Sequence, residues 1–336
     1  MKIGHIDTDQ EVFLIAEVGN NHEGDFRLAC ELVRLAAGAG AHAVKFQTII
    51  PERLVPPSQE ARLATLRKFQ FSPEQFRKLR DEADRAGILF MSTPFDLIAV
   101  DMLAPLVPAF KIASGDNDFF PLIERAAATG KPLIISMGLG HSPRASELRD
   151  FVDAMWQKHG VTDGQLAFLH CVVSYPTPPE DAGLFGMWPL RLPGVTVGYS
   201  DHTIGIRVAP LAVAAGARII EKHFTIRHDY SEFRDHQLSA NPDELRDLAK
   251  AIREVDAMLG HGTAPLRKSE AGNELAVRRS IAATRAISKG EIITESDLCW
   301  LRPRTGMKPG EEHLVCGRHA ARDIAAGEAF TPDMLS

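Results

Sequence analysis

The sequence has few cysteines, no long apolar run and no excess of positive charge. Its four cysteines are far apart in 336 residues and form no Cys-x-x-Cys pair, which argues against a disulfide framework or a zinc knuckle. No apolar stretch approaches the roughly 18–20 residues of a membrane helix, and the start lacks a signal-peptide core. Lys and Arg total 38 against 44 Asp and Glu, which disfavours sequence-independent nucleic-acid binding. We therefore expect a cytoplasmic protein that binds neither nucleic acid nor membrane.

The chain instead contains short β-branched runs that alternate with amphipathic stretches between residues 11 and 258. Eight strand–helix units in about 250 residues predict a (β/α)8 TIM barrel. An open doubly wound sheet is the alternative, but Gly19-Asn-Asn-His-Glu-Gly24 is not the Gly-rich nucleotide loop that such a sheet would normally carry. The predicted strands are 12–18, 43–47, 88–93, 109–113, 132–137, 166–172, 195–199 and 218–224, and the clearest helices are 26–39, 73–86, 121–128, 145–158 and 208–215.

The barrel pattern ends near residue 259. Residues 260–275 are polar and glycine-containing, and they indicate a linker. Residues 276–336 contain an internal repeat, because 286–298 and 323–335 both follow I-x-x-G-E-x-x-T-x-x-x-L. Two such halves predict a small, pseudo-symmetric β-rich module after the barrel. Within the barrel, the long connection 50–72 is either an active-site lid or a surface excursion.

Polar or ionisable residues occupy the carboxyl end of every predicted strand, which is where barrel enzymes carry their chemistry. Ordinary turn chemistry explains two or three such positions, not eight. The residues of interest are Glu17, Lys45, Gln47, Lys111, Ser114, Asp116, Ser136, Tyr175, Ser200, His202, Glu221 and His223.

Lys45 and Lys111 lie within apolar runs, where an unpaired lysine is rarely found. Together with the neighbouring serines, they are typical of a site that binds an anion. Two histidines on sequential strands can bind one divalent cation, although two ligands alone are a weak metal signal. Carboxylates on the first and last strands flank the same cavity. The residues thus predict an enzyme in which a phosphorylated acid meets a metal-polarised carbonyl.

Seven short motifs follow one another along the barrel part of the chain. They are Ile15-Ala-Glu-Val-Gly-Asn-Asn-His-Glu-Gly24, Val44-Lys-Phe-Gln47, Phe90-Met-Ser-Thr-Pro-Phe95, Lys111-Ile-Ala-Ser-Gly115, Leu169-His-Cys-Val-Val-Ser-Tyr-Pro-Thr-Pro178, Gly198-Tyr-Ser-Asp-His-Thr203 and Ile220-Glu-Lys-His-Phe224. This ordered set resembles the sialic acid (nonulosonic acid) synthase family. The C-terminal repeat, with Leu301-Arg-Pro303, resembles the antifreeze-like (SAF) domain of those enzymes.

The resemblance implies condensation of phosphoenolpyruvate with an N-acyl hexosamine, such as N-acetylmannosamine, and water. The products are phosphate and a nine-carbon 2-keto-3-deoxy acid. It also implies the roles of individual residues: catalysis by Glu17, Lys45, Lys111 and Glu221; phosphoenolpyruvate binding by Lys45, Lys111, Ser114, Ser136 and Ser200; sugar binding by Gln47, Asp116, Tyr175, Glu221 and Arg302; and binding of Mn²⁺, or else Mg²⁺ or Co²⁺, by His202 and His223.

The family also implies a domain-swapped homodimer, in which the SAF domain of one subunit caps the barrel of its partner and supplies Arg302. Three departures from the family pattern leave the aldose open: Val173, Asp116 and the segment 233–239, which adds an aromatic and a cation near the barrel mouth. Two rival functions remain. One is a pyruvate aldolase with a Schiff base on Lys45 or Lys111, and the other is a non-enzymatic protein that works through its C-terminal module.

Overall fold

The computed structural model describes residues 1–140, 144–260 and 267–336. Its contacts divide the chain into two units, Met1–Gly260 and His261–Ser336. Part of the predicted linker, 261–266, lies outside the described residues, and the rest of it includes the short helix α11 (Lys268–Ala271). Among the described residues, none of the helices combines the length and apolarity needed to cross a membrane.

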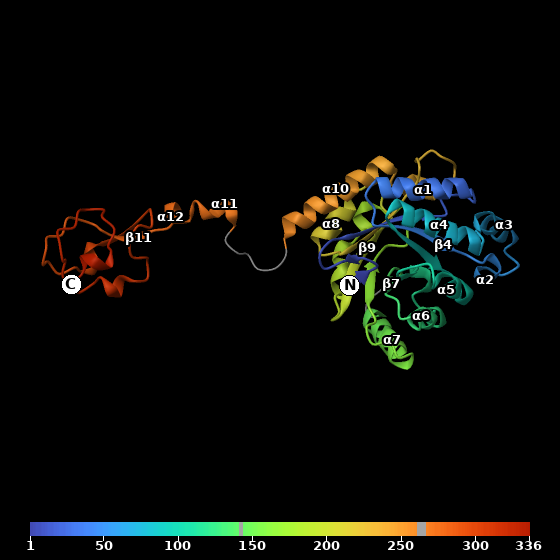
Figure 1. The fold of residues 1–336 in the computed structure, drawn as a ribbon, viewed down its shortest axis with the longest axis horizontal. Coiled ribbons are helices and arrows are strands. Elements are labelled where there is room, and N and C mark those ends of the chain that lie inside the picture. Colours follow the sequence, from blue (N-terminus) through green and yellow to red (C-terminus); the bar gives the residue numbers. More distant parts are fainter. Residues whose placement is uncertain (141–143, 261–266) are drawn as a thin grey trace. The chain divides into compact units, whose positions relative to one another are not determined.

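The first unit is built on eight strands that pair in parallel. Their order is β5-β4-β3-β10-β9-β8-β7-β6, and the two end strands, β5 and β6, lie side by side, so the sheet forms a nearly closed barrel (Figure 1). The predicted (β/α)8 barrel and its eight strands are confirmed. The strands are β3 (Phe13–Gly19), β4 (Ala43–Thr48), β5 (Leu89–Pro94), β6 (Phe110–Ile112), β7 (Leu133–Ser136), β8 (Leu166–His170), β9 (Val195–Asp201) and β10 (Ile219–His223).

Helices cover the outside of the barrel, and the five predicted ones appear within one residue of their expected ends. In α4, Ser72 caps the first turn and exchanges hydrogen bonds with Gln75, Pro73 occupies the first turn, and Gly87 ends the helix with a φ of 77°. These local signals fix both ends. The helices are α1 (Phe26–Gly38), α2 (Pro51–Leu54), α3 (Glu60–Phe69), α4 (Pro73–Ala86), α5 (Leu97–Leu103), α6 (Phe120–Ala127), α7 (Arg144–Lys158), α8 (Val208–Ala214), α9 (Asp235–Leu238) and α10 (Pro242–Leu259).

A short hairpin closes the amino-terminal end of the barrel. It consists of β1 (Lys2–Ile3) and β2 (Ile6–Asp7), which pair antiparallel. Ile3 and Ile6 join the buried cluster inside the barrel, together with side chains such as Met91. The barrel is therefore filled at this end, and its chemistry is left to the opposite end.

The long connection 50–72 forms two helices, α2 and α3. The backbone of this segment packs closely against Gly24, in the loop between β3 and α1. A Cβ at Gly24 would lie 2.0 Å from the carbonyl oxygen of Lys68, and the φ of Gly24 is +86°. Only glycine fits such a close approach of two backbones. The crossover from β8 to β9 contains a 3-10 helix, η3 (Leu184–Leu190), where the other crossovers contain α-helices.

The second unit follows the internal repeat. After α12 (Glu274–Val277), strands β11 (Ser280–Ala283) and β12 (Leu298–Leu301) pair antiparallel. Ile287 and Ile324, which are equivalent in the two halves, exchange backbone hydrogen bonds of 2.9 Å each. Arg285 binds Glu291 at 2.7 Å, and the equivalent Arg322 and Glu328 repeat this contact at 2.8 Å. The pseudo-symmetry predicted from the sequence is therefore visible in the hydrogen bonding.

Candidate active site

The carboxyl ends of the barrel strands surround a cavity of about 590 Å³. Most of the predicted site residues lie on its wall. They come from the carboxyl ends of several strands or from the residues that follow, so the barrel brings together side chains far apart in the sequence. The lining residues are Glu17, Lys45, Gln47, Thr93, Phe95, Lys111, Ala113, Ser114, Ser136, Cys171, Tyr175, Ser200, His202, Glu221, His223, Arg234 and Asp235.

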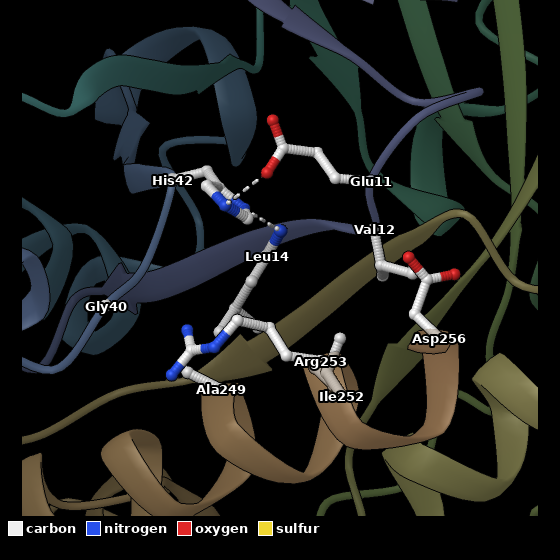
Figure 2. Close-up of a pocket in the computed structure, with 9 residues that line it drawn as sticks. All are labelled: Glu11, Val12, Leu14, Gly40, His42, Ala249, Ile252, Arg253 and Asp256. Atoms are coloured by element: carbon white, nitrogen blue, oxygen red, sulfur yellow. Dashed lines mark hydrogen bonds and ion pairs between the residues drawn. The ribbon is translucent and has the colours of Figure 1, made fainter. Parts of the chain in front are cut away.

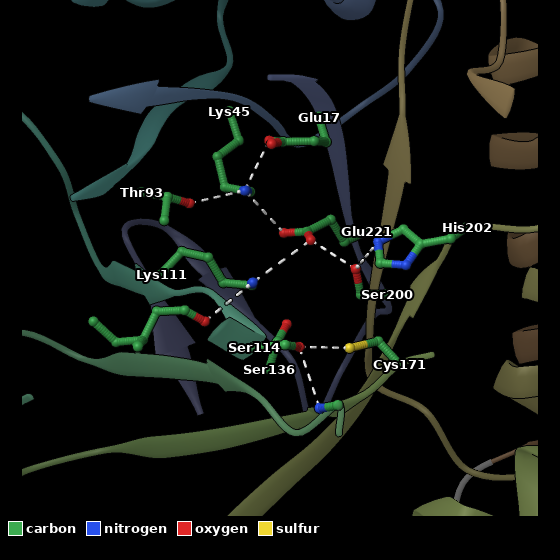
Figure 3. Close-up of polar contacts among 12 residues, drawn as sticks. Glu17, Lys45, Thr93, Lys111, Ser114, Ser136, Cys171, Ser200, His202 and Glu221 are labelled. Carbon is green, nitrogen blue, oxygen red and sulfur yellow. Dashed lines mark hydrogen bonds and ion pairs between the residues drawn. The ribbon is translucent and has the colours of Figure 1, made fainter. Parts of the chain in front are cut away.

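Four buried charges form the centre of the cavity (Figure 3). Lys45 Nζ lies 2.8 Å from Glu17 Oε2 and 3.4 Å from Glu221 Oε2. Lys111 Nζ lies 3.6 Å from Glu221 Oε1. Each of the four residues is at most 4% exposed. Glu221 is thus a shared counter-ion between two lysines, and Ser200 Oγ donates to it at 2.8 Å.

The two carboxyls of this cluster have opposite pKa shifts. Burial raises the pKa of Glu17, and the attraction of Lys45 only partly offsets that rise. Burial also acts to raise the pKa of Glu221, but Lys111 and Lys45 overcome it and hold the value below its usual range. When two neighbouring carboxyls have well-separated pKa values, the one with the higher value can act as a general acid while the other remains ionised. Glu17 is therefore the group suited to carry a proton, and Glu221 stays ionised.

The two lysines also differ. Burial acts to lower the pKa of Lys45, but the carboxylates of Glu17 and Glu221 raise it above its usual value. Burial lowers the pKa of Lys111, and Glu221 opposes that shift only in part. With Glu17 protonated, two lysines face one carboxylate, which leaves an excess positive charge. A buried site of this kind favours an anion.

Hydroxyl and thiol groups line the cavity floor beside Lys111. Ser114 Oγ lies 2.8 Å from Cys171 Sγ and accepts a hydrogen bond of 3.2 Å from the backbone N–H of Gly138. A Cβ at Gly138 would lie 2.6 Å from Val173 Cγ2 and 2.8 Å from Ser114 Oγ, so a side chain here would displace one or both of them. Ser136 Oγ is buried and makes no hydrogen bond to any described residue. A buried hydroxyl that has no hydrogen-bond partner in the protein can donate one to an oxygen atom of a bound ligand.

The two histidines predicted to bind a metal lie together, with ring centres 5.4 Å apart. His202 Nδ1 lies 2.7 Å from the carbonyl oxygen of Val172. A carbonyl only accepts, so Nδ1 carries the proton and Nε2, which lies 3.5 Å from Ser200 Oγ, keeps its lone pair. Burial lowers the pKa of both imidazoles, so both are neutral at pH 7. Nδ1 of His223 is buried and makes no hydrogen bond within the described part of the chain.

These features fit a divalent cation bound by two imidazoles, with its other positions open to water and substrate. Among the described residues there is no group of three or more His, Cys, Asp or Glu side chains arranged to hold a metal. Two imidazoles are one ligand fewer than the three protein ligands of typical catalytic zinc sites, so a cation here would take its other ligands from water or substrate.

Strand alternation explains a buried pair behind the histidines. Asp201 lies between Ser200 and His202, and Lys222 between Glu221 and His223. The two intervening side chains therefore face away from the cavity. They meet with Lys222 Nζ 3.1 Å from Asp201 Oδ2, and both are fully buried. This ion pair joins β9 and β10 on the side opposite the cavity.

Two predicted site residues are not on the cavity wall. Asp116 follows Ser114 in a 3-10 turn, η1 (Ser114–Asp116), and is not a lining residue. At three residues per turn, neighbours two apart point in different directions, whereas a strand would have kept them on one face. Asp116 is thus off the cavity wall, and its role in sugar binding stays a prediction. Arg302 follows β12 in the second unit, where it is exposed.

Six lining residues had no predicted binding role: Thr93, Phe95, Ala113, Cys171, Arg234 and Asp235. Thr93 accepts a hydrogen bond of 3.0 Å from Lys45 Nζ, and its place at a predicted strand end was a usable signal. Arg234 ends the connection after β10, which has no periodic pattern, and Asp235 is the first residue of the short helix α9. The one sequence signal for these two residues was that the segment 233–239 departs from the family pattern near the barrel mouth.

A second cavity, of about 310 Å³, lies where the start of β3, the α1–β4 connection and α10 meet (Figure 2). His42 Nδ1 accepts a hydrogen bond of 2.9 Å from the backbone N–H of Leu14, and its Nε2 lies 3.5 Å from Glu11 Oε2. The rest of its wall is largely apolar, with side chains such as Val12 and Ile252. It lacks the lysines and hydroxyls of the first cavity, so we place no chemistry there.

Comparisons with known proteins agree with these observations. The NeuB family model matches residues 32–264, and the SAF domain model matches residues 278–336. The chain is 37% identical to the N,N'-diacetyllegionaminic acid synthase of Legionella pneumophila, over 94% of this chain and 92% of that protein. It is 33% identical to the human N-acetylneuraminate-9-phosphate synthase, over 84% and 80% respectively. A crystal structure of the N-acetylneuraminic acid synthetase of Leptospira borgpetersenii superposes with a TM-score of 0.74 at 34% identity, covering 81% of this chain and 94% of that one.

Proposed function

Since the chain belongs to the NeuB family and carries a SAF domain, we propose that it is a nonulosonic acid synthase. The proposed reaction joins C3 of phosphoenolpyruvate to the aldehyde carbon of an N-acyl hexosamine such as N-acetylmannosamine. Water adds at C2, the C2–O bond to phosphate breaks, and the products are phosphate and a nine-carbon 2-keto-3-deoxy acid. The observation that carries this proposal is the buried Lys45–Lys111–Glu221 cluster within one cavity.

Phosphoenolpyruvate would occupy the positive end of the cavity. Lys45 and Lys111 supply two buried cations, and the hydroxyls of Ser114, Ser136 and Ser200 line the wall. Carboxylate and phosphate oxygens would replace part of the lysines' present contacts with Glu17 and Glu221. The charge-assisted hydrogen bonds so formed are stronger than neutral ones, which offsets the desolvation of the ligand.

Glu17 would transfer the proton. Its pKa is raised by burial, so a proton is available near neutral pH, and Gln47 Nε2 orients it by donating to Oε1 at 3.3 Å. The aldehyde oxygen gains a proton as the carbon–carbon bond forms, and Glu17 is the side chain suited to give it. Glu221 stays ionised and would position the sugar or the attacking water. Tyr175, whose ring lies 4.2 Å from that of His202, would close the sugar side of the cavity.

A divalent cation, with Mn²⁺ the first choice and Mg²⁺ or Co²⁺ the alternatives, would be held by His202 and His223. When bound, it supplies Lewis-acid polarisation of the aldehyde oxygen. The hydrogen bond from His202 Nδ1 to the Val172 carbonyl supports this role, since it directs the Nε2 lone pair away from the backbone. The neutral state of both rings supports it as well.

We also propose that the working form is a domain-swapped homodimer, in which the SAF domain of one subunit caps the barrel of its partner and Arg302 reaches the sugar. Light scattering gives the oligomeric state directly. Arg302→Ala should raise KM for the sugar more than KM for phosphoenolpyruvate. A fully active monomer, or an equal loss for both substrates, would rule this arrangement out.

Phosphate release from phosphoenolpyruvate tests the reaction class. The protein with Mn²⁺ is given a panel of N-acyl hexosamines and plain aldoses, and Lys111→Met serves as the control that removes one buried cation. Release that depends on one sugar and is lost in Lys111→Met supports the proposal. Release without any sugar, or in the variant at the wild-type rate, contradicts it.

The lowered pKa of Lys111 favours one second candidate, a Schiff-base pyruvate aldolase. That reaction needs an uncharged amine and no metal. Borohydride reduction in the presence of pyruvate would trap a covalent adduct on Lys111. An adduct, together with no phosphate release, would favour the aldolase over the synthase.

A further inference from the structure

The connection between β10 and α9 brings a cation, Arg234, to the wall of the active-site cavity. Its guanidinium carbon lies 5.4 Å from the centre of the Tyr175 ring, and the side chain is 68% exposed. The guanidinium makes no hydrogen bond to any residue that the structure describes. Within the same residues, the one carboxylate within 4 Å is that of Asp235, with 3.5 Å between Arg234 Nε and Asp235 Oδ1.

The backbone on both sides of Arg234 is held in place. On one side, the Phe233 ring meets that of Phe69 edge to face, with centroids 5.4 Å apart. On the other, His236 is fully buried, with Nε2 2.9 Å from Glu23 Oε1 and Nδ1 2.6 Å from Thr225 Oγ1. The backbone from which the Arg234 side chain extends is therefore held at a defined place on the cavity wall.

The order of groups along the cavity wall indicates what Arg234 meets. Tyr175 contacts the His202 ring at 4.2 Å and the Arg234 guanidinium at 5.4 Å, so it lies between them. Lys45 and Lys111 already have Glu221 as counter-ion at the centre. Arg234 has unused donors at the mouth. A planar guanidinium gains most from a phosphate or a carboxylate, which it binds through two parallel hydrogen bonds.

We propose that Arg234 forms a second anion subsite, which binds a phosphate or carboxylate at the end of the acceptor sugar remote from its aldehyde. This inference rests on the proposed function, because it takes the histidine end of the cavity as the place of the aldehyde. It makes the preferred acceptor an acidic aldose, and it names Arg234 as the residue that selects it.

Three sugars test the subsite: N-acetylmannosamine, its 6-phosphate and the corresponding 6-carboxylate, a uronic acid. Wild type should use one of the charged sugars with the highest kcat/KM, and which one distinguishes phosphate from carboxylate. Arg234→Met should lower kcat/KM for that sugar, relative to the neutral one, by about 30-fold, because it removes a hydrogen-bonded ion pair. KM for phosphoenolpyruvate should change far less. The matched control is Arg227→Met, since Arg227 also lies over a tyrosine ring, that of Tyr230 at 5.8 Å, but is not a lining residue.

A binding measurement keeps this test separate from the test of the reaction. Calorimetry measures binding of each charged sugar to wild type and to Arg234→Met without turnover. Binding that depends on Arg234, with no phosphate release from phosphoenolpyruvate, would sustain the subsite and reject the proposed reaction. A wild type that prefers the neutral sugar, or an Arg234→Met variant with the same selectivity as wild type, would overturn the subsite whatever the reaction.

Discussion

Replacement of Lys222 by methionine tests how β9 and β10 are held behind the active site. Lys222 Nζ lies 3.1 Å from Asp201 Oδ2 and donates to the carbonyl of Thr203 at 2.5 Å. Both charged side chains are 0% exposed. Removal of one partner leaves the other charge buried and uncompensated, which costs about 3–5 kcal/mol. We expect Lys222→Met to lower the free energy of unfolding by that amount.

A second substitution separates charge from packing. Asp201 Oδ1 accepts from the backbone N–H of Thr203 at 3.0 Å and from its hydroxyl at 2.8 Å, and an asparagine would keep both bonds. The double variant Lys222→Met/Asp201→Asn holds no unpaired charge. It should therefore be more stable than Lys222→Met alone.

Urea unfolding followed by tryptophan fluorescence measures all three proteins. Lys250→Met is the control, because Lys250 is 70% exposed and pairs loosely with Glu254 at 3.8 Å. Its unfolding midpoint should match that of wild type. If Lys222→Met also matches wild type, or if the double variant is less stable than Lys222→Met, the buried charge is not what joins these strands.

Three further predictions concern proton transfer, the metal and pH. Glu17→Gln should lower kcat by about 100–10,000-fold with little change in phosphoenolpyruvate affinity, measured by steady-state kinetics and calorimetry; a parallel loss of affinity would make Glu17 a binding residue. Exhaustive chelation should abolish turnover, Mn²⁺ should restore it, and His223→Ala should weaken Mn²⁺ binding in calorimetry; full activity of metal-free protein would exclude the metal role. Burial lowers the pKa of His22 to about 4, so the fold favours its neutral form. The free energy of unfolding is therefore highest above about pH 6.5, the ordinary pKa of histidine. It falls by up to about 3 kcal/mol as the pH drops toward 4, because only the unfolded chain then takes up a proton at His22. His22→Phe should flatten urea-derived stability between pH 6.5 and 4, and an unchanged slope would place the titration elsewhere.

The elements with strong local signals were predictable. The helix α4 carries a serine cap at Ser72, a proline in its first turn and a glycine stop at Gly87, and its predicted and observed ends agree. Strand alternation likewise placed Ser200 with His202, and Glu221 with His223, on the face that lines the cavity. Both patterns depend on near neighbours in the sequence, so they are readable without the tertiary structure.

The remaining features depend on contacts between distant segments or on irregular backbone. The hairpin of β1 and β2 has two residues per strand, too few to show a period. Asp116 lies off the cavity wall because it is in a 3-10 turn after β6, where side-chain directions do not follow strand alternation. Arg234 reaches the cavity through a loop whose position is set by the contact of Phe233 with Phe69 and of His236 with Glu23. No local pattern records such contacts.

The fate of the bridging oxygen of phosphoenolpyruvate tests the central claim most directly. Phosphoenolpyruvate labelled with ¹⁸O at the oxygen between C2 and phosphorus is incubated with the protein, Mn²⁺ and the sugar panel. Mass spectrometry then measures the ¹⁸O content of the released phosphate and of the organic product. The account predicts sugar-dependent product in which the label is in the released phosphate and the new 2-keto oxygen comes from water. Label retained in the organic product, or no sugar-dependent product at all, would contradict it.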